Sequence, residues 1–532
     1  MQLPDTKSKK QKPLSGTKHV SKTTIIPASP TVLKRLNIPL EIRANFKHAR
    51  DKLLHRKEEN IIHDERLRPY QNNDVNFLIQ LKHGKGLFSE QRTGKTPTTL
   101  VAMRVLGETR NLIFTTKSNI IAWVQEYRKW HSGPVMTPLS SWTKERRDKA
   151  YRESTGTIVV NYAKAHFDYD ILFEIFRGCG QAIVIDEAHY LRNYTNALSK
   201  TSLRTGKLKH NSAKSVIGMI RLRKLFTDPY ALTGTPTANG EEDIFGILTF
   251  LFPEIFSAYY TMMHYYFLIT EDTWGKKQLH GYKPGKETEM QEFLETIATQ
   301  RKRIDIMTWL PKTDFEIIYL DPTEKQRKGF DELTRFYETH NIICENEISV
   351  MMALRQLTIY PKHFKWNEIG PKVEYIRDLM KDYPKKPIII LSYFSTILNE
   401  IVHDLKLNDS NYRILTGKSS AKDSYTYQTD YNDKKFYILF ANIDVFNVGL
   451  KYNRAEQIIF LDESLIHVYN QQAYDRFIPT NKQEALEKKD QKITLLLMKK
   501  SIDIYIHDML MDKKNKTDIV NNFIQNLKEN KE

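Results

Sequence analysis

The stretch "SEQRTGKTPTTL", residues 89–100, contains a Gly-Lys-Thr triplet directly before a run of residues with helical character. A loop that grips a nucleotide presents backbone N–H groups to a phosphate, in the pattern G-x-x-x-x-G-K-[ST]. Gly94, Lys95 and Thr96 fit this pattern, but Ser89 stands where the first glycine is expected. The triplet therefore predicts a phosphate site, although a triplet alone recurs by chance.

The residues around the loop indicate its structural context. "GLF" (86–88) reads as the end of a strand, and "TPTTLVAMRVL" (96–106) reads as a helix. A helix N-terminus offers free N–H groups and the positive end of its dipole to a phosphate. We expect Lys95 to reach the β- and γ-phosphates and the Thr96 hydroxyl to hold Mg²⁺. Arg92 either points outward or adds positive charge near the polyphosphate, and both alternatives stay open.

A pair of carboxylates strengthens the nucleotide interpretation. In "IVIDEAHYLRN" (183–193), an apolar strand leads into Asp186 and Glu187, about 90 residues after the loop. Hydrolysis of a nucleotide needs two such groups with different tasks. Asp186 is expected to hold Mg²⁺, and Glu187 is expected to orient the attacking water.

The chain organisation predicts an α/β protein. Short apolar runs such as "NLIFTT" (111–116) alternate with amphipathic helical segments, and this alternation returns at "PIIILSYF" (387–394). Strand–helix alternation favours doubly wound parallel sheets, which bind ligands at the carboxyl ends of their strands. At 532 residues the chain is too long for one ordinary core. We predict a basic, largely disordered arm (1–60), a first lobe that binds ATP (61–253), helical protrusions and a linker (254–366), a second lobe (367–510) and a charged tail (511–532).

Composition favours a polyanionic partner. The chain has 81 Lys and Arg against 64 Asp and Glu, a formal net charge of +17. Such a balance is typical of proteins that bind nucleic acid, although a merely soluble basic protein would also show it. Two cysteines suit a reducing cytosol, and neither a secretory signal nor a membrane span is expected. We expect a cytoplasmic protein, in the host cytoplasm if the origin is viral.

An ordered set of motifs resembles the superfamily-two helicases, and within them the Swi/Snf-type DEAH-box DNA helicases and translocases. The set includes "LRPYQ" (67–71), "DEAHYLRN" (186–193), "LTGTPTANGEEDIFGILTFLFP" (232–253) and "QQAYDRF" (471–477). It covers about residues 61–505. The resemblance implies two RecA-like lobes with helical Swi/Snf-type insertions, ATP and Mg²⁺ as cofactors, and DNA as partner.

The resemblance also assigns roles to individual residues. It implies catalytic roles for Lys95, Glu187, Gln472 and Arg476, and metal binding by Thr96 and Asp186. It implies that the nucleotide is bound by Gln71, Arg92, Thr93, Gly94, Lys95, Thr96 and Gly449. It implies that His189, Thr233 and Thr235 couple the nucleotide site to the nucleic-acid site. Nucleic acid is expected to contact Thr116, Lys117, Asn161, Tyr162, Tyr393 and Lys451.

The chain departs from the family pattern at two places. The family loop is typically D-E-x-G-x-G-K-T, so Ser89 and Arg92 differ from it. Family members also place two arginines three residues apart in the second lobe. Arg476 takes the first position, but Pro479 takes the second and offers neither charge nor a backbone donor. Either one arginine suffices, another cation such as Lys482 or Arg454 replaces the second, or the protein is a weak ATPase.

Two basic segments complete the interpretation. "KPGKETEMQEFLETIATQRKRIDIMTWLP" (283–311) is similar to the helical protrusion of Swi/Snf proteins, with Arg301, Lys302 and Arg303 near its basic turn. The insert "SKTSLRTGKLKH" (199–210) either grips phosphates or is a solvated loop. The compact chain resembles phage or viral members of the family.

The resulting prediction is an ATP-dependent translocase on duplex or forked DNA, acting in replication, repair or recombination. A strand-separating, branch-migrating or annealing helicase is the first alternative. An ATP-dependent DNA clamp with little turnover is an alternative of another class, and RNA is an alternative substrate.

Overall fold

The computed structural model describes residues 62–512, the strand 24–25 and residues 519 and 523, apart from the positions named at the end of this paragraph. Two α/β lobes lie next to each other, and the chain passes between them near α16 (Arg303–Ile306). No helix in the described ranges is long and apolar enough to cross a membrane. The undescribed positions within 62–512 are 118, 140, 193, 195–210, 238–240, 257–258, 272–276, 311–312, 447–451, 453, 477, 480–481 and 488–490.

The first lobe is built on a parallel sheet of seven strands in the order β10-β2-β7-β6-β3-β5-β4. Side chains of β3 alternate between two cores. Ile113 packs with the helices on one face, whereas Leu112 and Phe114 pack with those on the other. The strands are β2 (Lys85–Leu87), β3 (Leu112–Thr115), β4 (Val135–Met136), β5 (Thr157–Asn161), β6 (Gly180–Ile185), β7 (Phe226–Leu232) and β10 (Ala298–Thr299).

Helices cover both faces of this sheet, as the doubly wound prediction requires. One face carries α4 (Pro69–Gln80), α5 (Lys95–Val105) and α6 (Ile120–Trp130). The other elements of the lobe are α7 (Lys144–Glu153), α8 (Lys164–Phe167), α9 (Tyr169–Phe176), η1 (Ala188–Arg192), α12 (Asn211–Arg223), η2 (Glu241–Asp243) and α13 (Ile244–Leu251).

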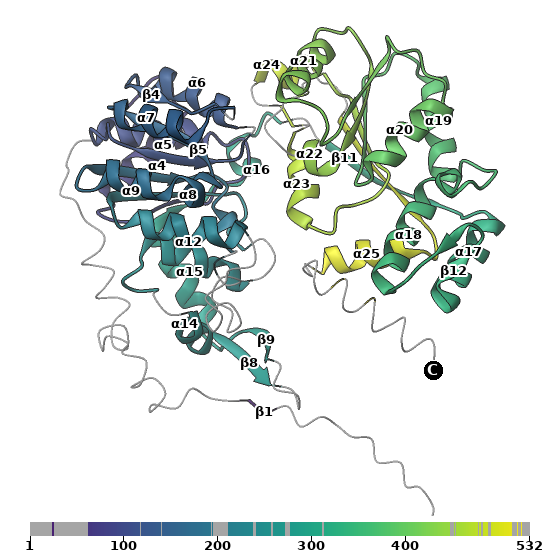
Figure 1. Cartoon of the computed structure of the whole chain (residues 1–532), viewed down its shortest axis with the longest axis horizontal. Helices are drawn as coiled ribbons and strands as arrows, with labels where there is room; N and C mark the ends of the chain where they lie inside the picture. Colours follow the sequence, from purple (N-terminus) through teal and green to yellow (C-terminus); the bar gives the residue numbers. More distant parts are fainter. Residues whose placement is uncertain are drawn as a thin grey trace, which may run out of the picture.

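A protrusion extends from the first lobe (Figure 1). It contains α14 (Tyr259–Tyr266), the antiparallel hairpin β8 (Phe267–Glu271) and β9 (Lys277–Tyr282), and α15 (Lys286–Ile297). Strand β1 (Thr24–Ile25) of the predicted N-terminal arm pairs with β8, and the remainder of that arm lies outside the described residues.

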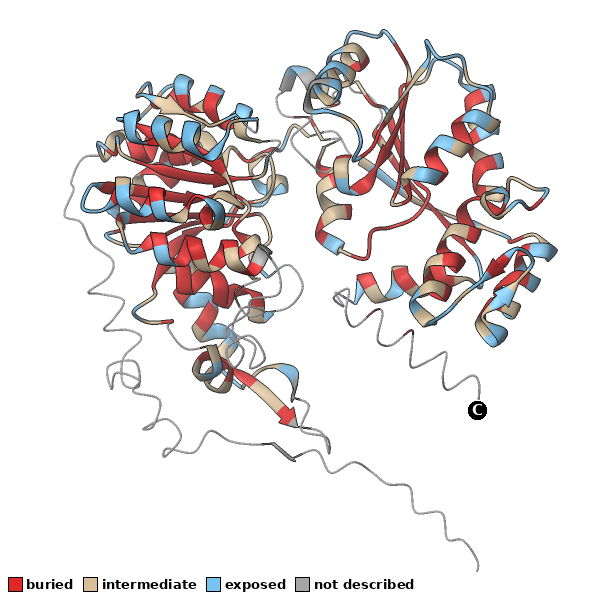
Figure 2. Cartoon of the chain, in the orientation of Figure 1, coloured by how far each residue is buried: buried red, intermediate tan, exposed pale blue. Residues whose placement is uncertain are grey.

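The second lobe repeats the architecture with six parallel strands in the order β11-β18-β17-β14-β16-β15. Its central strand β14 again alternates: Ile388 and Ile390 face one core, and Ile389 and Leu391 face the other. Figure 2 shows the buried strands at the centre of both lobes. The strands are β11 (Thr313–Leu320), β14 (Ile388–Ser392), β15 (Tyr412–Leu415), β16 (Ile438–Asn442), β17 (Gln457–Phe460) and β18 (Gln491–Met498).

The helices of this lobe surround the sheet and a satellite cluster at its side. A short hairpin of β12 (Glu338–Thr339) and β13 (Ile342–Ile343) joins two of them. The helical elements are α17 (Glu324–Phe336), α18 (Glu347–Ile359), η3 (Pro361–Phe364), α19 (Pro371–Asp382), α20 (Ser395–Asp404), α21 (Ala421–Asn432), α22 (Ile443–Phe446), α23 (His467–Asp475), α24 (Lys482–Glu487) and α25 (Ile502–Met511).

The segment that reads as a helical linker contributes to both sheets. β10 adds the edge strand next to β2 in the first lobe, and β11 adds the edge strand next to β18 in the second. Consequently the two lobes are connected by a short path between these two edge strands.

The C-terminal tail also has packed positions, because Ile519 and Phe523 are buried against α17, α18 and α25.

Candidate active site

The phosphate loop connects β2 to α5 at the carboxyl edge of the first sheet. Gly94 precedes the helix in the left-handed region, with φ 86°. A Cβ at this position would lie 2.0 Å from Gln71 Nε2, which donates to the carbonyls of Thr93 (3.3 Å) and Gly94 (3.4 Å). Only glycine fits both the backbone angle and the neighbouring amide. The structure thus brings Gln71, which was predicted to bind the nucleotide, against the predicted phosphate loop.

Lys95 lies inside this loop. Its Nζ donates to the carbonyls of Ser89 (2.8 Å) and Glu90 (3.1 Å). Burial lowers the pKa of Lys95, while the Glu187 and Asp186 carboxylates act in the opposite direction. The ammonium is therefore held between the loop carbonyls and within electrostatic reach of both acidic residues.

Asp186 is fixed at the end of β6 by donors from the neighbouring strand and helix. Its Oδ2 accepts the Thr115 hydroxyl (2.7 Å) and the Trp123 indole N–H (2.8 Å), and its Oδ1 accepts the Glu187 N–H (3.1 Å). Burial and the adjacent Glu187 charge raise the pKa of Asp186. Thr115 and Trp123 were not predicted. The indole was a usable signal, because a buried Trp N–H needs an acceptor.

Glu187 adopts a left-handed backbone conformation, with φ 48°. Non-glycine residues seldom take this region, and they cluster at functional sites. Its Oε1 accepts the Gln91 amide (2.7 Å), and its Oε2 lies 3.3 Å from His189 Nδ1. Burial opposes ionisation, but the contact with His189 and the charge of Lys95 outweigh it and lower the pKa of Glu187 to about 2. Glu187 is therefore an ionised carboxylate at neutral pH.

The predicted coupling residues lie together beside Glu187. Thr233 Oγ1 is 3.5 Å from His189 Nδ1, and the Thr235 N–H donates to Thr233 Oγ1 (3.1 Å). The chain of contacts runs from Glu187 through His189 to the end of β7. Asn239, which belongs to the same motif, lies outside the described residues.

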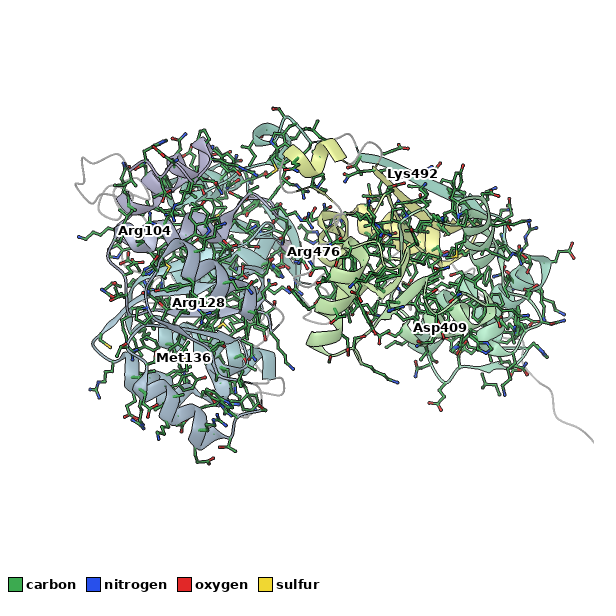
Figure 3. The ribbon with its side chains drawn as sticks, turned by 90° about the horizontal axis from the view of Figure 1, so that it is seen from above. Arg104, Arg128, Met136, Asp409, Arg476 and Lys492 are labelled. Atoms are coloured by element: carbon green, nitrogen blue, oxygen red, sulfur yellow. The ribbon has the colours of Figure 1, made fainter. Side chains whose placement is uncertain are left out.

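The second lobe contributes α23 to the site. Gln472 lies one turn before Arg476 and accepts the Arg476 N–H at its carbonyl (3.2 Å). Figure 3 shows Arg476 at the boundary between the lobes. Burial lowers the pKa of Arg476, whereas the carboxylates of Glu187, Asp475 and Asp186 raise it. The guanidinium therefore lies within electrostatic reach of the two acidic residues of the first lobe.

The residues present fit a bound Mg²⁺. Among the described residues no group of three or more His, Cys, Asp or Glu side chains could hold a metal alone. Mg²⁺ is usually held by one or two carboxylates together with substrate phosphates and water. Asp186 Oδ1 accepts one hydrogen bond from the described residues and keeps a second lone pair. Asp186, with the Thr96 hydroxyl at the start of α5, matches this requirement.

Comparison with known proteins identifies the family. A family model described as "SNF2-related domain" matches residues 70–363, which is more than half of the chain. This chain belongs to the SNF2-related family. The match confirms the Swi/Snf-type resemblance that the ordered motifs predict.

Several curated proteins and one solved structure are similar to this SNF2-related chain. "ISWI chromatin-remodeling complex ATPase ISW1" of Saccharomyces cerevisiae is 23% identical, over 77% of this chain and 37% of the relative. "Probable ATP-dependent DNA helicase CHR12" of Arabidopsis thaliana is 22% identical, over 77% of this chain and 38% of the relative. The chain thus spans less than half the length of these relatives. The Sulfolobus solfataricus SWI2/SNF2 ATPase core in complex with dsDNA has 18% identity and a TM-score of 0.37, covering 88% of this chain and 96% of that chain.

Several predicted residues of the SNF2-related chain take unexpected positions. Tyr162 was expected to face nucleic acid, but it is buried, stacks on Tyr190 and donates to the Asp186 carbonyl (2.6 Å). It therefore supports the acidic strand end from inside the lobe. Arg454, a candidate second cation, donates to the Phe436 carbonyl (2.7 Å) and stacks on two tyrosines. Since Phe436 precedes β16, Arg454 lies at the amino end of that strand, away from the site.

The other predicted nucleic-acid residues lie near the carboxyl ends of strands. Thr116 and the exposed Lys117 follow β3, Asn161 ends β5, and Tyr393 follows β14. The side chain of Lys482 lies outside the described residues, as do Gly449, Lys451 and the basic insert 199–210.

Arg301 and Arg303, which were expected near the basic turn of the protrusion, lie against the phosphate loop. Arg301 pairs with Asp74 (2.7 Å), and its carbonyl accepts the Glu90 N–H (2.9 Å). Arg303 donates its N–H (2.9 Å) and its Nε (3.1 Å) to Glu90 Oε2. They reach the loop because β10, directly before them, returns the chain to the sheet edge beside β2.

Proposed function

We propose that this chain hydrolyses ATP with Mg²⁺ and uses the cycle to move along duplex DNA. One observation carries the proposal: Arg92 of the phosphate loop donates to the Arg476 carbonyl of the second lobe (2.6 Å), so Arg476 lies against the first lobe, where the Glu187 and Asp186 carboxylates raise its pKa against the effect of burial. A hydrolytic site assembled from two lobes couples the chemistry to their relative motion. Without this arrangement, the loop and carboxylates would indicate nucleotide binding alone.

Each group of the site has a physical task in this proposal. The N–H groups at the start of α5 and the Lys95 ammonium bind the phosphates. Asp186 and Thr96 would hold Mg²⁺, which neutralises phosphate charge when it is bound. Glu187, kept ionised by its surroundings, orients the attacking water and polarises it. Arg476 stabilises the negative charge that spreads over the transferred phosphoryl group.

DNA is proposed as the track for two reasons. The net charge of +17 favours a polyanion, and the similar proteins are named as chromatin-remodeling ATPases and DNA helicases. Contacts to the phosphate backbone would make binding tolerant of sequence and sensitive to salt. A cytoplasmic location and a role in replication, repair or recombination belong to the same proposal.

The proposal is tested by ATP hydrolysis with duplex DNA, single-stranded DNA, forked DNA and RNA as separate additions. We expect duplex DNA to stimulate hydrolysis most, and Lys95→Ala to abolish it while DNA binding stays. Arg152→Ala is the control, because Arg152 forms an exposed ion pair with Glu174 on the first lobe. Wild-type turnover in Lys95→Ala would remove this loop from the site.

A second assay separates movement from strand separation. A translocase displaces a third strand from a DNA triplex, whereas a helicase unwinds a forked duplex. Tight DNA binding with ATP, without stimulated hydrolysis in any arm, would favour the clamp alternative.

A further inference from the structure

Two arginines of the first-lobe side contact one short segment of the second lobe. Arg92 donates through Nη2 to the Arg476 carbonyl (2.6 Å) and through Nη1 to the Ile478 carbonyl. Arg303 pairs through Nη1 with Asp475 Oδ1 (2.7 Å). All three acceptors belong to residues 475–478, the segment that carries Arg476, and Arg476 lies between the lobes in Figure 3.

The backbone of Arg92 is held in an unfavourable conformation. Its φ is 65°, in the left-handed region that glycine adopts freely. Other residues adopt this region at an energetic cost. Strain of this kind persists where surrounding contacts determine the conformation, and the contacts of Arg92 with the second lobe contribute to this.

One acceptor of Arg92, the Arg476 carbonyl, belongs to the C-cap of α23, and the other, the Ile478 carbonyl, lies two residues beyond it. The last carbonyls of a helix have no partner within it, and they form the negative end of its dipole. α23 ends at Asp475, and Pro479, shortly after it, has no N–H to offer. A guanidinium suits this position, because its planar fork can serve two carbonyls at once.

Arg303 connects the same segment to the same loop. Its Nε and its backbone N–H hold Glu90 Oε2, and Glu90 lies two residues before Arg92. The side chains of Arg303 and Asp475 are 12% and 7% exposed, so this ion pair is largely shielded from water. Gln471 Nε2 also donates to Asp475 Oδ1 (3.2 Å) and fixes the carboxylate from within α23.

We propose that Arg92 and Arg303 are positioning residues that form a latch between the phosphate loop and the segment 475–478. The latch holds the backbone of Arg476 from the opposite lobe and sets its guanidinium toward Glu187 and Asp186. Because Arg92 and Glu90 belong to the loop that binds phosphate, the position of Arg476 depends on the state of that loop. The inference rests on the proposed ATPase function.

The latch also bears on Pro479, which stands where the family places its second arginine. Resemblance to the family favours a second arginine at this position. In the structure Pro479 follows the carbonyl of Ile478, which Arg92 holds from the facing lobe. The Arg92 guanidinium of the first lobe therefore brings a positive charge to the segment 475–478, next to Pro479.

The first test is a cycle of variants measured by ATP turnover. Arg92→Gly suits the left-handed backbone and so preserves the loop fold. We expect it to lower kcat about 10- to 100-fold through misplacement of Arg476, with KM for ATP nearly unchanged. Arg92→Lys keeps the charge but loses the planar fork, so it restores less than half of the lost turnover. Arg152→Ala is the control with unchanged turnover.

The cycle distinguishes positioning from direct action. If Arg92 acts through Arg476, Arg92→Gly changes turnover by less than about twofold in an Arg476→Ala background. Multiplied losses in the double variant, or a single Arg92→Gly variant within about twofold of wild type, would overturn the latch.

The second test does not require hydrolysis. Cys179 is exposed in the first lobe, and Asp409→Cys with Cys344→Ser places one further label in the second lobe. The distance between fluorescent labels is measured on the full chain without nucleotide. We expect Arg92→Gly and Arg303→Gln each to lengthen or broaden this distance, and Arg152→Ala to leave it unchanged. Unchanged distances in both latch variants would refute the latch, whereas absent ATP turnover in the wild type would refute the proposed function alone.

Discussion

The two lobes place an aspartate at the same point of the same architecture but surround it differently. Asp186 directly follows β6 and accepts the Thr115 hydroxyl (2.7 Å) from the end of β3, the adjacent strand. Asp462 follows β17 and accepts the Ser392 hydroxyl (2.7 Å) from the end of β14, again the adjacent strand. The Thr115 and Ser392 hydroxyls each connect the ends of two adjacent parallel strands, so the fold that the lobes share explains why both aspartates accept such a hydrogen bond.

The difference lies in the neighbouring charges. Burial raises the pKa of both aspartates, but at Asp462 the paired Arg355 (2.9 Å) and Lys372 oppose the effect. At Asp186 the adjacent Glu187 adds to the effect, and Lys95, whose ammonium donates to loop carbonyls, opposes it. The second lobe compensates its buried charge with a directly paired guanidinium. The first lobe accumulates negative charge that a metal and a cation from the other lobe can use.

The largest effect is expected from substitutions of the two first-lobe carboxylates. Glu187→Gln keeps the shape of the side chain and removes the charge that orients water, so turnover should fall about 10³-fold or more while ATP still binds. Asp186→Asn should instead weaken Mg²⁺ binding. Nucleotide affinity and turnover are measured as functions of Mg²⁺ concentration. Equal losses of affinity in the two variants would contradict the separate roles.

The matching change in the second lobe should affect stability first. Arg355→Met leaves the buried Asp462 carboxylate without its guanidinium, and losing one partner of a buried pair costs about 3–5 kcal/mol. Denaturant unfolding of the full chain gives the free-energy change. Arg355→Met with Asp462→Asn should recover part of the loss. If Arg355→Met lowers the free energy of unfolding by less than about 1 kcal/mol, the Asp462 carboxylate does not depend on Arg355 as a buried partner.

A smaller effect tests how Asp186 is held. Trp123→Phe removes the indole N–H that stabilises the ionised carboxylate, at a cost of about 1–3 kcal/mol. The pKa of Asp186 should rise, so the acid limb of the turnover profile should move to higher pH. Trp130→Phe is a matched control, since Trp130 Nε1 donates to Glu126 (2.7 Å) in the same helix but outside the site. An identical shift in both variants would exclude the specific role of Trp123.

The smallest effect concerns the pH dependence of second-lobe stability. The hydrogen bond that His507 Nδ1 donates to Glu463 Oε2 (2.9 Å) raises the pKa of His507. This pair therefore stabilises the fold fully below the unfolded-state pKa of about 6.5, and the contribution is lost as pH rises through the folded-state pKa. His507→Gln should lower the free energy of unfolding near pH 6 but not near pH 9. A difference that grows with rising pH would have the wrong sign.

Local patterns in the sequence predicted much of the first-lobe site. Gly94 and Lys95 needed only the loop pattern, and Asp186 and Glu187 only an apolar strand with an acidic end. The two-lobe fold followed from the alternation of strands and helices, which local periodicity records.

Tertiary packing decided what the sequence could not show. Trp123 and Gln91 reach the carboxylates from other elements, and no local pattern specifies those contacts. Arg303 was placed on the protrusion because the two-residue strand β10 is too short to show a period. Tyr162 was given to the surface because the end of a strand looks the same whether its side chain points outward or back into the lobe.

The central claim is that hydrolysis uses one site shared by two lobes. Its most direct test is ATP turnover of Arg476→Ala at saturating ATP and duplex DNA, beside Lys482→Ala and the lobe-two control Arg377→Ala, whose side chain is 52% exposed. A site shared by two lobes should lose about 10³-fold in turnover in Arg476→Ala, with turnover kept in the other two variants. Turnover of Arg476→Ala within about tenfold of wild type, or collapse of Lys482→Ala instead, would contradict it.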